Sequence, residues 1–191
     1  MHDLPNNAVN YPLLARPHIQ LYGTVDEVMY AGFKDQLDAA PAEGPLVVSI
    51  TTLGGDPEMA RAMGDSIRLL RDYTGRDTLF LGKVAVYSAG ATLMSAFPVE
   101  HRFLTRGTRL MLHERQMSGS IDLSGPLTNL PVVLKAKLNE IEQSVRIQEE
   151  GFRAIVNGSK VTFETLREKA RSNWYIDAEE ARELGLVLDV I

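Results

Sequence analysis

Two long apolar runs, each followed by small residues and then by a helical pattern, most constrain how this chain can fold. The runs are PLVVSITT (45–52) and TLFLGKVAV (78–86). Nearly continuous apolar runs of this kind are typical of parallel strands whose two faces are both covered. Because strands alternate with helices, the sequence predicts an α/β fold with a sheet built from right-handed crossovers.

The other predicted elements come from periodicity and turn residues. Asp56 is placed to cap a helix whose first residue is Pro57 and which runs to about Tyr73. HRFLTRGTRLMLHE (101–114) predicts two short strands around a glycine turn. The remaining predictions are a strand at 18–23, a helix at 25–40 that buries Val28, Phe33 and Leu37, helices at 88–97 and 161–172, an edge strand at 118–124, and a final helix capped by Asp177.

The chain is predicted to consist of an arm, residues 1–17, and one domain, residues 18–191. The arm is polar, contains two prolines and lacks a clear period, so we expect it to be extended or mobile. A much longer helical pattern covers about 130–157 and has an apolar stripe. That helix either wraps its own domain or projects and packs against a partner subunit. The stripe is formed by Val133, Leu134, Leu138, Ile141, Val145 and Ile155.

Composition excludes several classes of function. The net charge of −5 and the pI of about 5.4 argue against nucleic acid or an anionic membrane as the main partner. With no cysteine, the chain has no disulfide, no cysteine-ligated zinc and no cysteine nucleophile. We also expect no signal peptide and no membrane span, because no basic start precedes an apolar stretch and no window approaches 18 apolar residues.

The stretch VAVYSAGA (84–91) puts Ser88 where a predicted strand becomes a helix. Free backbone N–H groups at such a junction can stabilise an anion, including the oxyanion of acyl transfer, and small neighbours admit a substrate backbone. Alternatively, Ser88 simply caps the helix. The nucleophile elbow of α/β-hydrolases does not fit, because Val86 stands where G-x-S-x-G requires glycine.

His113 and a glycine pair are the other candidate functional residues. In RLMLHER, strand alternation puts Arg109, Met111 and His113 on one face, and His113 ends the strand where a cleft could lie. A structural or solvated histidine is the alternative. Gly54 and Gly55 precede a helix and could present backbone amides to a ligand.

Taken together, these motifs resemble the Clp protease proteolytic subunit family, ClpP. The family pattern is a P-G-G loop, A-S-M-G-A around the nucleophile and R-x-M-I-H around the histidine. Ser88 and His113 are 25 residues apart (113 − 88), which is similar to the family's spacing. YIDAEEARELGLVLDVI also resembles the family's ending, so the resemblance covers residues 18–191. It implies the ClpP/crotonase-like fold, a repeated β-β-α superhelix with a projecting handle helix at about 130–157.

The resemblance also implies a function. Ser88 would be the nucleophile, His113 its general base, and the N–H groups of Gly55 and Ala89 the oxyanion hole, with no metal or cofactor. Residues 118–124 would hold an extended peptide as an added strand. The protein would be a cytoplasmic, ATP-dependent Clp-type serine endopeptidase subunit acting on peptides or unfolded proteins. Its expected partners are copies of itself, in heptameric rings stacked into a tetradecamer, and an AAA+ unfoldase.

Several residues depart from the family pattern. Asn173 stands where the third catalytic residue, an aspartate, is expected, and asparagine can orient an imidazole without supplying a charge. In chymotrypsin-type enzymes the Asp-to-Asn change lowers kcat about 10⁴-fold, so a weakened Ser88–His113–Asn173 triad is expected. Asp177, four residues on, is a possible substitute. Tyr87 replaces an alanine beside the nucleophile and is expected to narrow the pocket.

Two alternatives to an active peptidase stay open. The chain could be a catalytically impaired scaffold or regulatory subunit of a mixed assembly, and Asn173 supports that reading. It could also be another crotonase-like enzyme, for example one in which a lysine acts as the base. Lys83, five residues before Ser88, is the candidate lysine, although a solvated strand residue is the simpler interpretation.

Overall fold

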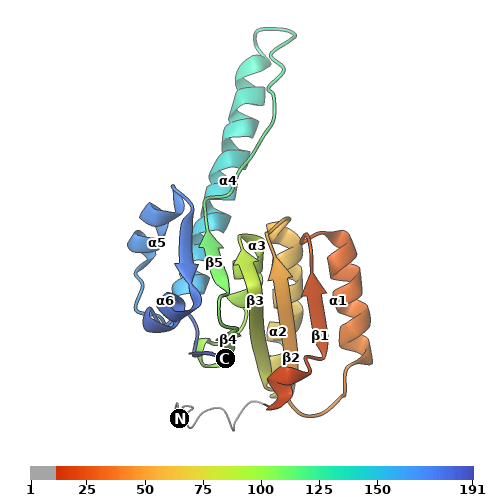
Figure 1. Ribbon diagram of the computed structural model, residues 1–191. Coiled ribbons are helices and arrows are strands. Elements are labelled where there is room, and N and C mark those ends of the chain that lie inside the picture. The colour runs from red at the N-terminus through yellow and green to blue at the C-terminus, as the bar shows by residue number, and fades with distance from the viewer. Residues whose placement is uncertain (1–11) are drawn as a thin grey trace.

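The computed structural model describes residues 12–191 and contains a seven-stranded sheet. All strand pairs are parallel except β5 with β6. In the view of Figure 1, helices α2 and α3 lie behind the sheet and α1 lies beside β1 at its edge. The strands are β1 (Ile19–Tyr22), β2 (Leu46–Thr52), β3 (Thr78–Tyr87), β4 (Arg102–Leu104), β5 (Arg109–Leu112), β6 (Trp174–Asp177) and β7 (Asp189–Val190). The α-helices are α1 (Glu27–Ala39), α2 (Pro57–Thr74), α3 (Ala89–Met94), α4 (Leu130–Val156), α5 (Phe163–Ala170) and α6 (Ala178–Glu183).

The central sheet follows the order β1-β2-β3-β4-β7, and β5 joins it by pairing with both β3 and β6. The apolar runs form β2 and β3, as predicted. Four of the seven β2 residues, from Leu46 to Val48 and at Ile50, are buried hydrophobic residues at 0% exposure. The short strands β6 and β7 were not predicted.

Only part of the predicted N-terminal arm is described. Residues 1–11 lie outside the described part of the chain. Pro12–Ala15 form a 3-10 helix instead of extended chain. Leu14, which is 3% exposed, packs in a small cluster with Val47, Leu81 and Phe103. This part of the predicted arm therefore docks on the sheet.

The cap of α2 agrees with the prediction, whereas the buried face of α1 does not. The Asp56 carboxylate accepts hydrogen bonds from the N–H groups of Glu58 and Met59, and Pro57 begins the helix. In α1, Val28 is 79% exposed and Met29 is buried in its place together with Phe33. Met29 and Phe33 are four residues apart, closer to one helical turn than the predicted spacing of five.

A bulge in β3 positions the strand end that precedes Ser88. Ile50 and Thr52 of β2 face Gly82 and Val86 of β3, so two extra β3 residues are accommodated there. Within this bulge, Val84 has a φ of 62°. Before the bulge β3 pairs with β4, and after it β3 pairs with β5. The bulge thus brings the end of β5 beside the end of β3.

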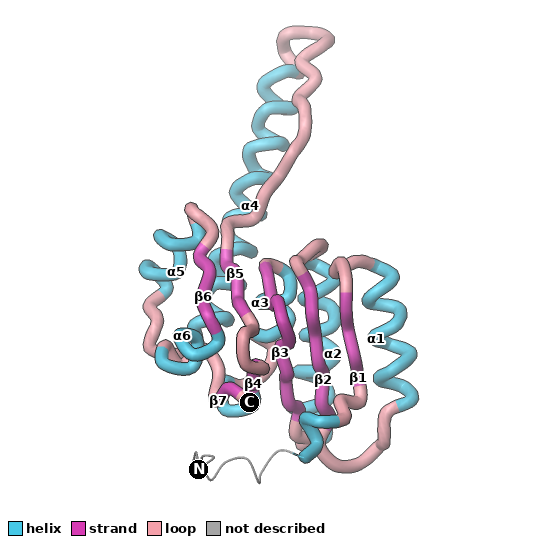
Figure 2. Tube along the Cα trace, in the orientation of Figure 1, coloured by secondary structure: helices cyan, strands magenta, loops and turns pink. Residues whose placement is uncertain are grey.

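Residues 113–129 run outward from the body beside α4, and α4 returns from the tip to the body (Figures 1 and 2). Its 27 residues correspond to about 40 Å at 1.5 Å per residue. Its buried residues are confined to the C-terminal end, at Phe152, Ile155 and Val156. The other residues of the predicted stripe are 42–54% exposed; they are Val133, Leu134, Leu138, Ile141 and Val145.

The prediction of a strand at 118–124 is wrong for the chain described. This segment has no strand structure and is exposed. It lies along α4, since the Cβ that a side chain would add at Gly119 falls 3.9 Å from Lys137 Nζ. A helix offers no free edge of backbone hydrogen-bonding groups, so the segment has no partner strand to pair with.

Arg102 joins the base of α4 to the body. It is 2% exposed and donates to carbonyl oxygens of three separate segments. Burial lowers the pKa of Arg102 to about 10, so the guanidinium stays charged at neutral pH. The acceptors are the carbonyls of Phe97 (2.8 Å from Nε), Ile155 (3.1 Å from Nη1), Leu186 (3.3 Å from Nη1) and Ser95 (3.4 Å from Nη2).

Candidate active site

Ser88 occupies the junction between β3 and α3 in an unusual backbone conformation. Its φ and ψ are 51° and −111°, and its side chain makes no capping hydrogen bond to α3. Instead, Ser88 Oγ lies 2.7 Å from His113 Nε2. The Ser88 N–H also donates to the Met111 carbonyl at 2.8 Å, which ties the junction to β5. The structure therefore does not support the interpretation of Ser88 as a simple helix cap.

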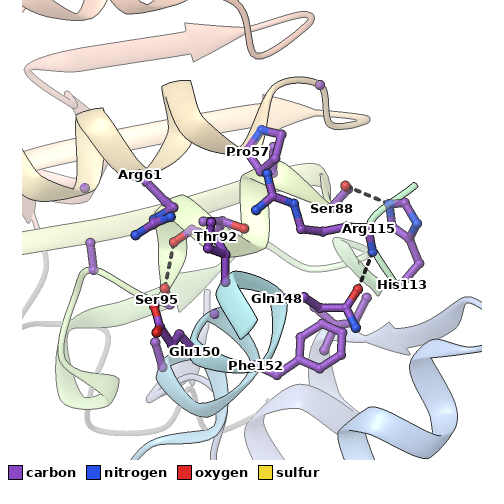
Figure 3. Close-up of a pocket in the computed structure, with 18 of the residues that line it drawn as sticks. Pro57, Arg61, Ser88, Thr92, Ser95, His113, Arg115, Gln148, Glu150 and Phe152 are labelled. Carbon is purple, nitrogen blue, oxygen red and sulfur yellow. Dashed lines mark hydrogen bonds between the residues drawn. The ribbon is translucent and has the colours of Figure 1, made fainter. Parts of the chain in front are cut away.

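His113 follows β5 directly and is half-buried. Leu110 and Leu112 are 0% and 2% exposed, so they fix β5 in the core, and Leu112 and His113 both line the cavity beside Ser88. Figure 3 shows the imidazole pointing at the Ser88 hydroxyl. The two candidates that the sequence put 25 residues apart are thus brought into hydrogen-bond contact.

The glycine pair packs closely against the same junction. A Cβ at Gly54 would lie 2.9 Å from Ser88 Cβ, and one at Gly55 would lie 2.2 Å from the Val25 carbonyl oxygen. Both glycines have positive φ, 112° and 143°. Among residues 12–191, the N–H groups of Gly55 and Ala89 make no hydrogen bond, and both residues line the cavity beside Ser88. Their role as an oxyanion hole stays a prediction.

Asn173 lies near His113 but does not orient it. The N–H groups of Asn173 and Glu114 both donate to the Ala170 carbonyl at 3.3 Å, so the two backbones are neighbours. Asn173 has a φ of 59°, which asparagine tolerates better than most residues. Within the described chain its side chain makes no hydrogen bond, and none reaches His113 Nδ1. Asn173, the third residue of the predicted triad, therefore lies next to His113 without forming a hydrogen bond to it.

Asp177 cannot replace Asn173 in this arrangement. It pairs with Arg109 across β5 and β6, at the end of β5 opposite to His113. Its carboxylate accepts from Arg109 Nε at 2.8 Å, and this hydrogen bond raises the pKa of Arg109. Asp177 precedes α6 as predicted, but its side chain makes no capping hydrogen bond.

A cavity of about 600 Å³ opens beside the Ser88–His113 pair, between α2, α3 and the base of α4. Its walls include Arg61 of α2, Thr92 of α3 and Phe152 of α4 (Figure 3). Tyr87 is not part of the lining. It packs edge-on against Tyr175, with ring centroids 5.6 Å apart, so the expected narrowing by Tyr87 is wrong.

Lys83, the candidate base of the alternative enzyme, is not part of the cavity lining either. It is half-buried in the β3 bulge, and no hydrogen bond joins it to Ser88 in the described part of the chain. The geometry therefore gives no support to a serine–lysine site.

Arg115 is a residue of the site that sequence reasoning did not single out. Its N–H donates to Gln148 Oε1 at 2.6 Å, and its Nη2 donates to Glu58 Oε1 at 2.7 Å. These contacts join the segment after His113 to both α4 and α2. Glu58 is 57 residues from Arg115, so no local sequence pattern could have indicated the pair.

Residues 12–191 contain no group of three or more His, Cys, Asp or Glu arranged to hold a metal ion. None of the helices in that range is both long enough and apolar enough to cross a membrane.

Comparison with known proteins matches residues 6–191 to the Clp protease family. Over 171 residues the chain is 29% identical to the ATP-dependent Clp protease proteolytic subunit 2 of Pseudomonas aeruginosa, which covers 88% of this chain and 78% of that protein. Over 185 residues it is 26% identical to the ATP-dependent Clp protease proteolytic subunit of Bdellovibrio bacteriovorus, which covers 95% and 82%.

The fold is also similar to a solved structure. An asparagine-to-aspartate mutant of ClpP1 from Listeria monocytogenes superposes with a TM-score of 0.67 at 22% identity, covering 91% of this chain and 90% of that one. The α/β fold expected from the sequence is confirmed.

Proposed function

Because this chain belongs to the Clp protease family, we propose that it is a serine-type endopeptidase subunit that hydrolyses peptide bonds. The observation that carries the proposal is the 2.7 Å contact between Ser88 Oγ and His113 Nε2 at the mouth of a cavity. A nucleophile and a base within hydrogen-bond reach, beside free backbone amides, are what acyl transfer requires.

The proposed reaction follows from this geometry. His113 Nε2 removes the Ser88 proton as Oγ attacks the peptide carbonyl, and the N–H groups of Gly55 and Ala89 stabilise the resulting oxyanion. His113 then protonates the leaving amine, which departs and leaves an acyl-enzyme. Water, deprotonated by the same imidazole, attacks the acyl-enzyme; the ester bond breaks, the acyl part of the peptide leaves as a carboxylic acid, and His113 returns the proton to Ser88 Oγ.

Asn173 limits this proposed reaction. The imidazole becomes positively charged in the transition state, and a neutral amide stabilises that charge less than a carboxylate does. The side chain must also turn toward His113 Nδ1 before it helps at all. We therefore propose a weak Ser88–His113–Asn173 triad and a low turnover.

We further propose that the chain works as a homo-oligomer. The exposed apolar stripe of α4 supports a subunit contact, because stripes of this kind are normally buried in an interface. Heptameric rings, stacked into a tetradecamer that encloses a chamber, are the proposed assembly, and an AAA+ unfoldase is the proposed partner. The cytoplasmic location stays a prediction.

Labelling with a fluorophosphonate probe tests the proposed nucleophile. We expect the purified protein to be labelled at Ser88, and expect Ser88→Ala and His113→Ala to lose the label, since the probe reacts only with an activated serine. The variants should first be compared with the parent by circular dichroism. Labelling that survives Ser88→Ala would contradict the proposal.

The substitution Asn173→Asp tests the weak triad. A carboxylate at this position should raise peptidase kcat by at least about tenfold at neutral pH, because it can stabilise the imidazolium. Asn173→Ala is the matched control and should not raise kcat. An Asp variant that is no faster than the parent would show that Asn173 is not what limits turnover.

A catalytically impaired scaffold subunit is the second candidate function. The observation that favours it is that the Asn173 side chain makes no hydrogen bond in the described chain. An unlabelled protein that nevertheless assembles into rings, as measured by light scattering, would favour this candidate over the peptidase.

A further inference from the structure

Arg115 lines the cavity next to the proposed nucleophile and forms an ion pair with Glu58. Arg115 follows His113 by two residues, whereas Glu58 belongs to the first turn of α2, which follows the glycine pair. Their side chains meet at 2.7 Å, and the Arg115 side chain is 27% exposed. Figure 3 shows the Arg115 side chain extending toward Pro57, at the same end of the cavity as Ser88.

The ion pair of Arg115 is shared with a second arginine. Glu58 also accepts from Arg61 Nη1 at 3.2 Å, so two guanidinium groups share one carboxylate. Arg68, further along α2, is paired with Asp65. Glu150 lines the cavity from α4 at the Ser95 end, away from Arg115 (Figure 3). Arg115, beside Ser88, therefore shares its carboxylate partner with Arg61.

We propose that Arg115 determines specificity by binding the acidic side chain of a peptide residue that enters this cavity. This inference rests on the proposed peptidase function. A substrate Asp or Glu carboxylate would take the Arg115 guanidinium, while Glu58 would remain paired with Arg61. Each of the two guanidinium groups would then have a carboxylate of its own, held by charge-assisted hydrogen bonds that can be bidentate. The selected residue is the one whose carbonyl Ser88 attacks, because its side chain is next to the nucleophile.

The two members of the ion pair should have opposite effects on binding. Arg115→Gln removes the cation that recognises the substrate, whereas Glu58→Gln removes the carboxylate that competes with the substrate. If the ion pair acted only as a strap across the cavity, both substitutions would open the cavity and change the binding of all peptides alike.

Peptide binding to the Ser88→Ala variant tests the proposal without requiring turnover. Three fluorescent peptides would be compared by anisotropy, identical except for Glu, Gln or Leu at the selected position. We expect the Glu peptide to bind about tenfold more tightly than the Gln peptide. Arg115→Gln should abolish this difference and Glu58→Gln should increase it. Arg182→Gln, which removes an exposed ion pair with Glu179 on α6, is the matched control.

Three results would overturn the proposal. They are equal binding of the Glu and Gln peptides, no measurable binding of the Glu peptide, and parallel changes for all three peptides in the Arg115 and Glu58 variants. Fluorophosphonate labelling of the Ser88-containing parent remains a separate readout. A labelled enzyme that prefers the Leu peptide would retain the peptidase function and lose the acidic specificity.

Discussion

Helices α2 and α4 have similar amphipathic patterns but opposite surroundings. The apolar face of α2 is buried in the body, where Met63 and Ile67 are both 0% exposed. The corresponding stripe of α4 is buried only near the helix C-terminus, and Leu138 is 54% exposed. An amphipathic period therefore identifies a face that needs burial without saying whether the same chain provides the cover.

The proposed active site lies where these two regions meet. Ser88 and the glycine pair come from the body, whereas Gln148 and Phe152 come from the base of α4. A change in the orientation of α4 would move one wall of the cavity relative to the nucleophile. We infer that contacts at the base of α4 affect both stability and the shape of the site.

The largest effect is expected from breaking the connection between the two regions. Arg102→Ala leaves the carbonyls of Phe97, Ile155 and Leu186 without their donor and opens a cavity in the core. We expect the free energy of unfolding to fall by about 4 kcal/mol. Urea unfolding monitored by circular dichroism measures this change.

A conservative variant separates the charge from the geometry at this position. Arg102→Lys keeps the charge but has one nitrogen instead of three. Its free energy of unfolding should therefore fall below that of the parent, but by less than that of Arg102→Ala. A loss below about 1 kcal/mol for Arg102→Ala, the range of an ordinary surface substitution, would contradict the role given to Arg102.

A smaller effect, of opposite sign, is expected in the body at the β3 bulge. Val84 is β-branched, has a φ of 62° and is 69% exposed, so it carries backbone strain and contributes little burial. Val84→Gly should raise the free energy of unfolding by about 1 kcal/mol, after subtraction of the entropy that glycine adds to the unfolded chain.

Two controls sharpen this test. Val84→Ala removes the β-branch and retains a Cβ, so it should give only part of the gain. Val86→Gly should destabilise, because Val86 is fully buried two residues later in the same strand. If thermal unfolding showed the Val84→Gly variant to be less stable than the parent, the bulge would not be strained.

The sequence predicted elements whose signals are local. The apolar runs of β2 and β3, the Asp56 cap of α2 and the length of α4 all follow from residues close to one another in the chain. The strand predicted at 118–124 failed because residue type alone does not supply a neighbouring strand. β6 was missed because Trp174–Asp177 has only four residues, of which two are buried.

The residues of the candidate site also divide into those with a local sequence signal and those without one. Ser88 and His113 were found because each ends a recognisable strand and because their motifs resemble a known family. Arg102 and Arg115 were missed, since their partners lie up to 84 and 57 residues away and depend on how α4 and α2 pack. The disengaged side chain of Asn173 is a rotamer choice that no sequence pattern encodes.

The smallest effect on the stability of the single chain is expected on the projecting part of α4. Leu138 is half-exposed, so Leu138→Ala should change the free energy of unfolding of a dissociated subunit by less than about 0.5 kcal/mol. Ile67→Ala, on the buried face of α2, is the matched substitution and should cost about 3 kcal/mol. Denaturant unfolding at low protein concentration compares the two under the same conditions.

The same pair of variants should rank in the reverse order when assembly is measured. If the α4 stripe is a subunit contact, removing the Leu138 side chain takes apolar area out of that interface, and the protein concentration needed for assembly should rise. Sedimentation velocity over a dilution series measures this concentration.

Equal assembly of the parent and Leu138→Ala, repeated for Ile141→Ala, would mean that the stripe does not associate and that α4 is stable in water by itself. An isolated helix of such length keeps its structure only when its sequence has high helix propensity, so that outcome would shift the explanation for the projecting helix from burial by a second subunit to local stabilisation within α4.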